Sequence, residues 1–253
     1  MHQHDGDAGG SSWIRRFHPR PDCLARLVCL PPAGQSASFY FSMSDEMTVS
    51  IEVLAVQYPG RQDRWSEPHV LTIQELAREV HAALGTWMDR PLLIFGHGMG
   101  ALVAFELARR LEREGTVPMV LFPSGRAAPS CTPGSFVHLR RDEGIVAHLQ
   151  AISGTRSPLT DDAQLLQLML PAIRDDYRAD ETYVYEPGSA LRCPIIAFVG
   201  EDDSTVVAED VVAWWEHTEG PFELLVVPGG HFFVLTHQSE VVNTISDFFL
   251  APR

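Results

Sequence analysis

The stretch that decides the fold is Leu92-Leu-Ile-Phe-Gly96-His97-Gly98-Met99-Gly100-Ala-Leu-Val-Ala-Phe105. A short apolar run leads into Gly-x-x-x-Gly and then directly into a segment whose apolar residues recur at helical spacing. Glycines on both sides of a tight turn allow a strand and a helix to approach each other closely. We therefore predict a strand, a tight turn centred on Gly98 and an amphipathic helix.

This combination is typical of the nucleophile elbow of α/β-hydrolases, in which a serine occupies the centre of Gly-x-Ser-x-Gly. Here the central residue is Gly98. A glycine has no side chain that can attack an acyl group, so we exclude an acyl-enzyme mechanism through this position. A chance glycine-rich turn is the less favoured interpretation, because a strand and a helix flank the motif as an elbow requires.

The rest of the sequence alternates strand and helix patterns. Apolar runs predict strands at 24–30, 49–56, 92–95, 119–122, 195–199 and 224–227. A capping box formed by Thr72 and Glu75 marks the start of one helix between them. We therefore predict an α/β fold with a mostly parallel, doubly wound sheet.

One segment interrupts the alternation. It has helical patterns and no convincing strand, and Pro171 is expected to end or kink a helix within it. We predict a helical lid over the carboxyl edge of the sheet, with a long crossover as the alternative. The predicted parts of the chain are a disordered tail (1–12), the core (13–139 and 186–253) and the lid (140–185).

Acidic residues and a histidine follow the last two predicted strands. Asp203 comes after the strand at 195–199, with Asp202 as the second choice of acid, and His231 comes after the strand at 224–227. An acidic loop or a single histidine is usually structural, but this order is the one in which α/β-hydrolases carry their acid and base. We predict that Asp203 orients His231 and stabilises its charged form.

Composition limits the kinds of partner and location. A formal net charge of −14 over 253 residues argues against nucleic acid. We find no apolar stretch long enough for a membrane span and no secretory signal, so we expect a cytoplasmic protein without a membrane partner. The four cysteines are scattered without metal-ligand spacing, so we expect no metal. We also expect no cofactor and a monomer.

Several segments together make the chain resemble the stand-alone type II thioesterases that accompany modular polyketide and nonribosomal peptide synthases. They are Trp13-Ile-Arg-Arg-Phe-His-Pro19, Val28-Cys-Leu-Pro-Pro-Ala-Gly-Gln-Ser-Ala-Ser-Phe-Tyr40, Val56-Gln-Tyr-Pro-Gly-Arg-Gln-Asp-Arg64, Ser124-Gly-Arg-Ala-Ala-Pro-Ser130 and Gly229-Gly-His-Phe232. The resemblance implies hydrolysis of acyl groups held on the phosphopantetheine arm of an acyl carrier protein. It also implies a lid over an acyl channel and a carrier protein that docks at the mouth of that channel. Arginines that cluster along the sequence, such as Arg15 and Arg16 or Arg109 and Arg110, would then contact the acidic carrier protein.

The chain departs from the family at the residues that carry the chemistry. The family's serine position is Gly98, and its Pro-His-Ala-Gly-Gly loop reads Pro31-Pro32-Ala33-Gly34-Gln35. The resemblance implies that the backbone amides of Ala33 and Met99 form the oxyanion hole. The side chains expected to contact the substrate are those of Pro32, Gln35, His97 and Phe232.

Gly98 leaves three interpretations open. The chain is an ordinary editing thioesterase carrying a Ser-to-Gly substitution, a natural variant that uses His231 and Asp203 as a base without a covalent step, or a carrier-binding protein without catalysis. We favour the second, because the oxyanion loop differs along with the elbow while the acid and the base are present. Ser36 and Ser124 are possible substitute nucleophiles, but both are better explained as loop hydrogen-bonding residues.

Overall fold

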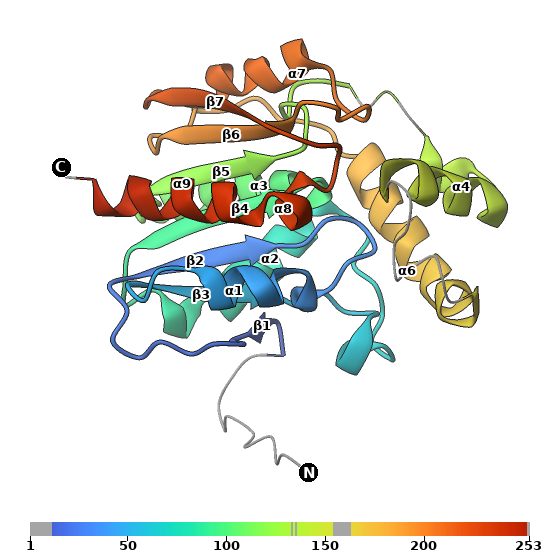
Figure 1. Cartoon of the computed structure of the whole chain (residues 1–253), viewed down its shortest axis with the longest axis horizontal. Helices are drawn as coiled ribbons and strands as arrows, with labels where there is room; N and C mark the ends of the chain where they lie inside the picture. The colour runs from blue at the N-terminus through green and yellow to red at the C-terminus, as the bar shows by residue number, and fades with distance from the viewer. Residues whose placement is uncertain (1–11, 133, 135, 154–162, 252–253) are drawn as a thin grey trace.

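The computed structural model describes residues 12–132, 134, 136–153 and 163–251, so the predicted tail lies almost entirely outside the described residues. Seven strands form one sheet in the order β1-β3-β2-β4-β5-β6-β7 (Figure 1). Their bounds are Ile14–Arg15, Ala25–Leu30, Ile51–Val56, Leu92–His97, Val120–Ser124, Ile195–Gly200 and Phe222–Val227. All strand pairs are parallel except β1 with β3, which confirms the predicted fold class.

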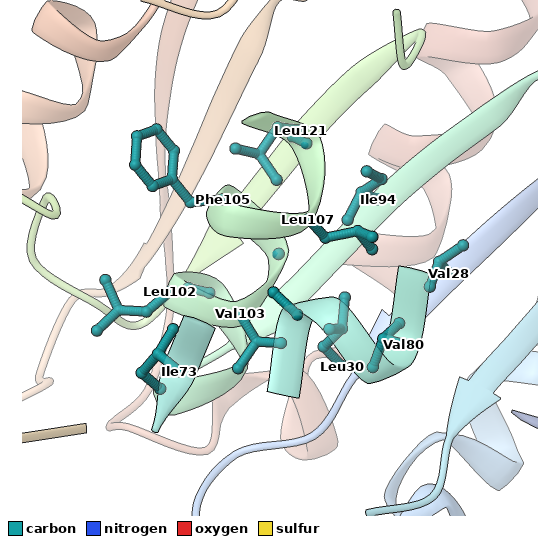
Figure 2. Close-up of a cluster of buried hydrophobic side chains, with 14 of the residues drawn as sticks. Val28, Leu30, Ile73, Val80, Ile94, Leu102, Val103, Phe105, Leu107 and Leu121 are labelled. Atoms are coloured by element: carbon teal, nitrogen blue, oxygen red, sulfur yellow. The ribbon is translucent and has the colours of Figure 1, made fainter. Parts of the chain in front are cut away.

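Helices cover both faces of the sheet. Those packed on the core are α1 (Phe41–Glu46), α2 (Ile73–Ala83), α3 (Met99–Arg113), α7 (Ala208–Val212), α8 (Phe233–Thr236) and α9 (Gln238–Leu250). One buried cluster joins α2 and α3 to the sheet, and a second joins α1, α8 and α9 to the opposite face. Figure 2 shows side chains of α2 and α3 gathered against β2, β4 and β5.

Burial on both faces explains why the strands read as continuous apolar runs. Adjacent residues of β2 belong to different clusters, Val28 to the one under α2 and α3 and Leu27 to the other. The threonine half of the predicted capping box is present as well: the Thr72 hydroxyl accepts the Glu75 amide at 3.2 Å, and it donates to the Glu75 carboxylate. None of the described helices is long and apolar enough to cross a membrane.

The predicted lid segment is helical where it is described, as α4 (Asp142–Ser153) and α6 (Ala163–Glu181) (Figure 1). Of the two effects expected of Pro171, the end of a helix is wrong, because Pro171 lies inside the single helix α6. Residues on both sides of the proline, Leu170 and Ile173, pack into one apolar cluster with α4. The packing of these residues against α4 compensates for the backbone hydrogen bond that is lost at the proline.

Candidate active site

Gly98 joins β4 to α3 in a sharp turn. Its backbone angles, φ 53° and ψ −124°, are rarely adopted by residues with a side chain. The flanking glycines are needed for the close approach: a Cβ added at Gly96 or at Gly100 would lie 2.1 Å from a backbone oxygen. The strand, tight turn and helix predicted from the sequence are therefore present, and steric collision explains why residues 96 and 100 are glycines.

Position 98 faces the predicted base. A Cβ built on Gly98 would lie 3.6 Å from His231 Nε2 and 3.3 Å from the Cβ of Pro32. The first distance would place a serine hydroxyl, one bond further out, within hydrogen-bonding reach of the imidazole. The second shows that Pro32 narrows the space beside the elbow. Gly98 thus lies beside His231 Nε2 and has no side chain of its own at this position.

Asp203, rather than Asp202, is the acid beside His231. His231 Nδ1 lies 2.9 Å from Asp203 Oδ2, while Asp202 is exposed. Burial opposes ionisation of Asp203, but hydrogen bonds from His231 and Thr205 together outweigh it and lower the pKa of the carboxyl. The predicted proximity is confirmed, and the carboxylate is set to hold His231 with Nε2 directed at position 98.

Thr205 is a member of this group that was not predicted. Its amide and hydroxyl both donate to Asp203 Oδ1, at 2.9 and 2.7 Å, and its hydroxyl oxygen lies 3.0 Å from His231 Nδ1. The Asp-x-Thr spacing is a common turn signal that would have placed the threonine beside the acid. Thr205 holds the Asp203 carboxylate in place, and that carboxylate in turn holds the His231 ring.

The two predicted oxyanion donors, Ala33 and Met99, line one cavity with Gly98 and His231. Met99 is the first residue of α3, so its amide has no acceptor within the helix. Among the described residues, neither amide donates to a protein acceptor. Both are therefore free to donate to an oxyanion, and the positive end of the α3 dipole adds to that stabilisation.

A buried carboxylate from α6 holds the loop that carries Ala33. Asp176 Oδ2 accepts the Gly34 amide at 2.7 Å and pairs with Arg61 at 2.5 Å, and all three groups are shielded from solvent. Position 34 favours glycine for two reasons. Its φ of 76° is rarely adopted by residues with a side chain, and a Cβ there would lie 2.8 Å from Ile173 Cγ1. No local pattern predicts this contact, because its partners are far apart along the chain.

We predict that Asp176→Asn destabilises the protein by about 3 kcal/mol, because it leaves Arg61 buried without its counter-charge. Asp142→Asn is the matched control: its carboxylate pairs with Arg174 at an exposed site, so the loss should stay below about 1 kcal/mol. Urea unfolding of the two variants measures both values. Equal losses would contradict the assigned role of Asp176.

Three of the four side chains expected to contact substrate, those of Pro32, Gln35 and Phe232, line the cavity. His97 does not, and this expectation is corrected: it is fully buried, with Nδ1 2.9 Å from the Ser124 hydroxyl. The reason is that its side chain packs beneath the elbow, where its ring lies 4.9 Å from that of His231. Burial and the neighbouring His231 hold the pKa of His97 well below its ordinary value.

The two serines considered as substitute nucleophiles lie outside the cavity lining. Ser124 is fully buried against His97, and the Ser36 hydroxyl is bonded to that of Ser38 at 2.8 Å. Among the described residues, neither forms a hydrogen bond with His231. Their position agrees with the interpretation that both are loop hydrogen-bonding residues.

The cavity lies between the elbow and the helices of the lid segment. Its volume is about 410 Å³, and its lid side is lined by His148 and Leu149 of α4 and by Tyr177 and Asp180 of α6. A cavity of this size accommodates a small organic group with one end at Gly98. Among the described residues, no three side chains of the usual metal-binding types are grouped closely enough to hold an ion.

Comparison with known proteins gives a consistent result. Residues 25–249 match the thioesterase domain family. The chain is 47% identical to thioesterase PikA5 of Streptomyces venezuelae, over 95% of this chain and 86% of that protein. It is 45% identical to a probable cadicidin biosynthesis thioesterase of Streptomyces griseus, over 94% of this chain and 66% of that protein.

Solved structures agree with the sequence comparison. The type II thioesterase BorB from the borrelidin biosynthetic cluster superposes with a TM-score of 0.89 at 45% identity, covering 94% of this chain and 98% of that one. YbtT, a type II thioesterase from the yersiniabactin pathway, gives a TM-score of 0.85 at 30% identity, covering 94% and 98%.

Proposed function

The chain belongs to the thioesterase family, and from that premise we propose that it acts on acyl thioesters or polyketide chains of polyketide or nonribosomal peptide biosynthesis without forming an acyl-enzyme. The observation that carries the proposal is the orientation of His231, whose Nδ1 contacts Asp203 and whose Nε2 faces the side-chain-free position 98. A base aimed at an open position can take a proton from water or from the substrate itself.

For hydrolysis, each proton can be followed. His231 Nε2 removes a proton from water as the water oxygen attacks the thioester carbonyl, and the amides of Ala33 and Met99 donate to the developing oxyanion. Collapse of the intermediate breaks the carbon–sulfur bond, and the imidazolium returns the proton to the leaving thiolate. Asp203 stabilises the imidazolium in between.

The same base suits reactions other than hydrolysis. Removal of a proton from a hydroxyl of the acyl chain leads to cyclisation, with the hydroxyl oxygen replacing water as the attacking atom. Removal of a proton from the carbon beside the carbonyl leads to elimination or isomerisation, and the oxyanion donors then stabilise an enolate. All of these need the His231–Asp203 pair and none needs a side chain at position 98.

We further propose that the substrate is presented on the phosphopantetheine arm of an acyl carrier protein, and that the protein is a cytoplasmic monomer. The names of its relatives, thioesterases of biosynthetic clusters, support a carrier-linked substrate. The arm itself supplies a thioester and no further chemistry, so the proton transfers remain those of His231.

The proposal is tested by incubating the unmodified protein with acyl-pantetheine thioesters, free and carrier-bound, while thiol release is followed and products are identified by mass spectrometry. We expect rates more than about 10³–10⁴-fold above the uncatalysed reaction, because an oxyanion hole and binding supply that much on their own and the base adds to it. Carrier binding without any product would instead favour a non-catalytic carrier-binding protein. The remaining alternative, an editing thioesterase with a substituted serine, is tested by the first prediction of the Discussion.

A further inference from the structure

His97 is a buried titratable residue beside the candidate active site that the proposed proton transfers do not use. It is the last residue of β4, immediately before Gly98, and it is fully buried. Its ring lies 4.9 Å from the ring of His231, and the two ring planes are inclined by 38°. A side chain that does not line the cavity therefore packs directly against the base.

The His97 ring is itself held by its surroundings. Its Nδ1 lies 2.9 Å from the hydroxyl of Ser124 at the end of β5. The ring also stacks on Phe39, with centroids 6.0 Å apart and planes inclined by 16°. Gly125 lies against both imidazoles, because a Cβ built there would be 2.7 Å from His97 Cε1 and 3.4 Å from His231 Cε1. These contacts leave the His97 ring little room to move.

The contact with His97 supplies a restraint that the hydrogen bonds of His231 do not. Nδ1 of His231 lies 2.9 Å from Asp203 Oδ2, and this hydrogen bond fixes one atom of the ring. A bond at one atom does not fix the plane of the ring, so Nε2 remains free to tilt away from position 98. A second ring packed against the imidazole restricts that tilt.

His97 also suits this place electrically. Burial and the neighbouring imidazole of His231 lower the pKa of His97, and together they outweigh Asp203, which raises it. The His97 ring is therefore uncharged around neutral pH. An uncharged ring can touch the imidazolium that His231 becomes during proton transfer without repelling it, so the positive charge stays on the ring that Asp203 faces.

We propose that His97 is a positioning residue for the base: its ring holds the plane of the His231 imidazole so that Nε2 points at position 98. This inference rests on the proposed function, because it concerns the base which that function uses. Loss of the ring should lower kcat by about 10- to 100-fold, since a misplacement of about 1 Å at a catalytic group has effects of that size. The affinity for substrate should change little, because His97 does not line the cavity.

The test compares two substitutions by steady-state kinetics. His97→Asn loses the ring but keeps an amide that can bond to Ser124, whereas His97→Phe keeps an aromatic ring and loses that bond. We expect kcat of His97→Asn to fall by about 10- to 100-fold with KM within about threefold, and His97→Phe to keep most of the rate.

His217→Asn is the matched control. His217 is likewise buried, its Nε2 lies 2.9 Å from the hydroxyl of Ser130, and it packs against the ring of Tyr185 without lining the cavity. The substitution should therefore destabilise the fold in a similar way and leave kcat unchanged. Thermal unfolding of both Asn variants measures the first effect.

Two further readouts distinguish positioning from a merely structural role. A residue that acts through His231 loses its effect when His231 is absent, so adding His97→Asn to His231→Ala should change the residual rate by less than about twofold. NMR spectra of histidine-labelled protein give a readout that needs no turnover. The Nδ1 proton of His231, identified by its absence in His231→Ala, should exchange with water at least about tenfold faster in His97→Asn.

If His97→Asn does not fold, Ser124→Ala takes its place, because it frees the His97 ring without removing it. We expect it to lower kcat by about three- to tenfold, again without effect when His231 is absent.

The outcomes separate this inference from the proposed function. An unchanged kcat in folded His97→Asn, an equal loss in His97→Phe, or a further loss in the His231→Ala background overturns the positioning role and leaves the proposed function standing. No product from the unmodified protein overturns the proposed function, and proton exchange of His231 that is unchanged in His97→Asn then overturns the positioning role as well. A loss in kcat that disappears without His231 establishes the role.

Discussion

Gly98→Ser is expected to raise the rate of thioester hydrolysis by at least about 10³-fold, the contribution that a triad nucleophile makes in serine hydrolases. The Cβ of the new residue lies 3.6 Å from His231 Nε2, so its hydroxyl can be deprotonated by a base that Asp203 already orients. The amides of Ala33 and Met99 are free to receive the oxyanion of the acylation step. Release of thiol from short acyl thioesters measures the gain.

The same substitution carries a conformational cost. A residue with a side chain at φ 53° and ψ −124° is strained by about 1–3 kcal/mol, and the new Cβ meets Pro32 at 3.3 Å. Gly98→Ala shares the strain and the contact but has no hydroxyl, so it should be destabilised equally and gain no activity. A folded Gly98→Ser protein without faster hydrolysis would mean that the cavity is built for other chemistry.

His231→Ala in the otherwise unmodified protein is expected to lower turnover by about 10²–10⁴-fold, the usual contribution of a general base. The loss follows from the geometry, because Nε2 of His231 is the base directed at position 98. His237→Ala is the matched control: it lies a few residues further on, and among the described side chains its ring forms a hydrogen bond only with Thr236. Steady-state rates of both variants on the preferred substrate provide the comparison.

Full activity in His231→Ala would overturn base catalysis by His231. A change in binding without a change in rate would indicate that His231 only shapes the cavity. Since the ring is mostly buried and touches His97 as well as Asp203, thermal unfolding of the variant should accompany the kinetics.

Much of the fold follows from local patterns in the sequence. Strands buried on both faces leave continuous apolar runs, and Gly96 and Gly100 mark a tight turn in which a Cβ at either position would collide with the backbone. The continuation of α6 through Pro171 could not be predicted, because the rule that proline ends a helix is local, whereas the packing of Leu170 and Ile173 depends on tertiary structure. The two-residue antiparallel strand β1 is too short to leave a pattern.

The residues of the candidate site, too, were predicted only where a local pattern marks them. Asp203 and His231 were predicted because parallel strands bring the loops at their carboxyl ends together. His97 was misplaced, since one sequence does not say which residue of a tight turn faces inward. Asp176 was not predicted at all, because its role depends on α6 meeting a loop far away along the chain.

The central claim is that this site catalyses without an acyl-enzyme, and the most direct test follows the intact mass of the unmodified protein during turnover of its acyl thioester. The geometry at Gly98 and His231 predicts thiol release and product with no acyl adduct on the protein at any time. An acyl adduct that forms and decays at the rate of product release would contradict it and would identify another nucleophile in the chain.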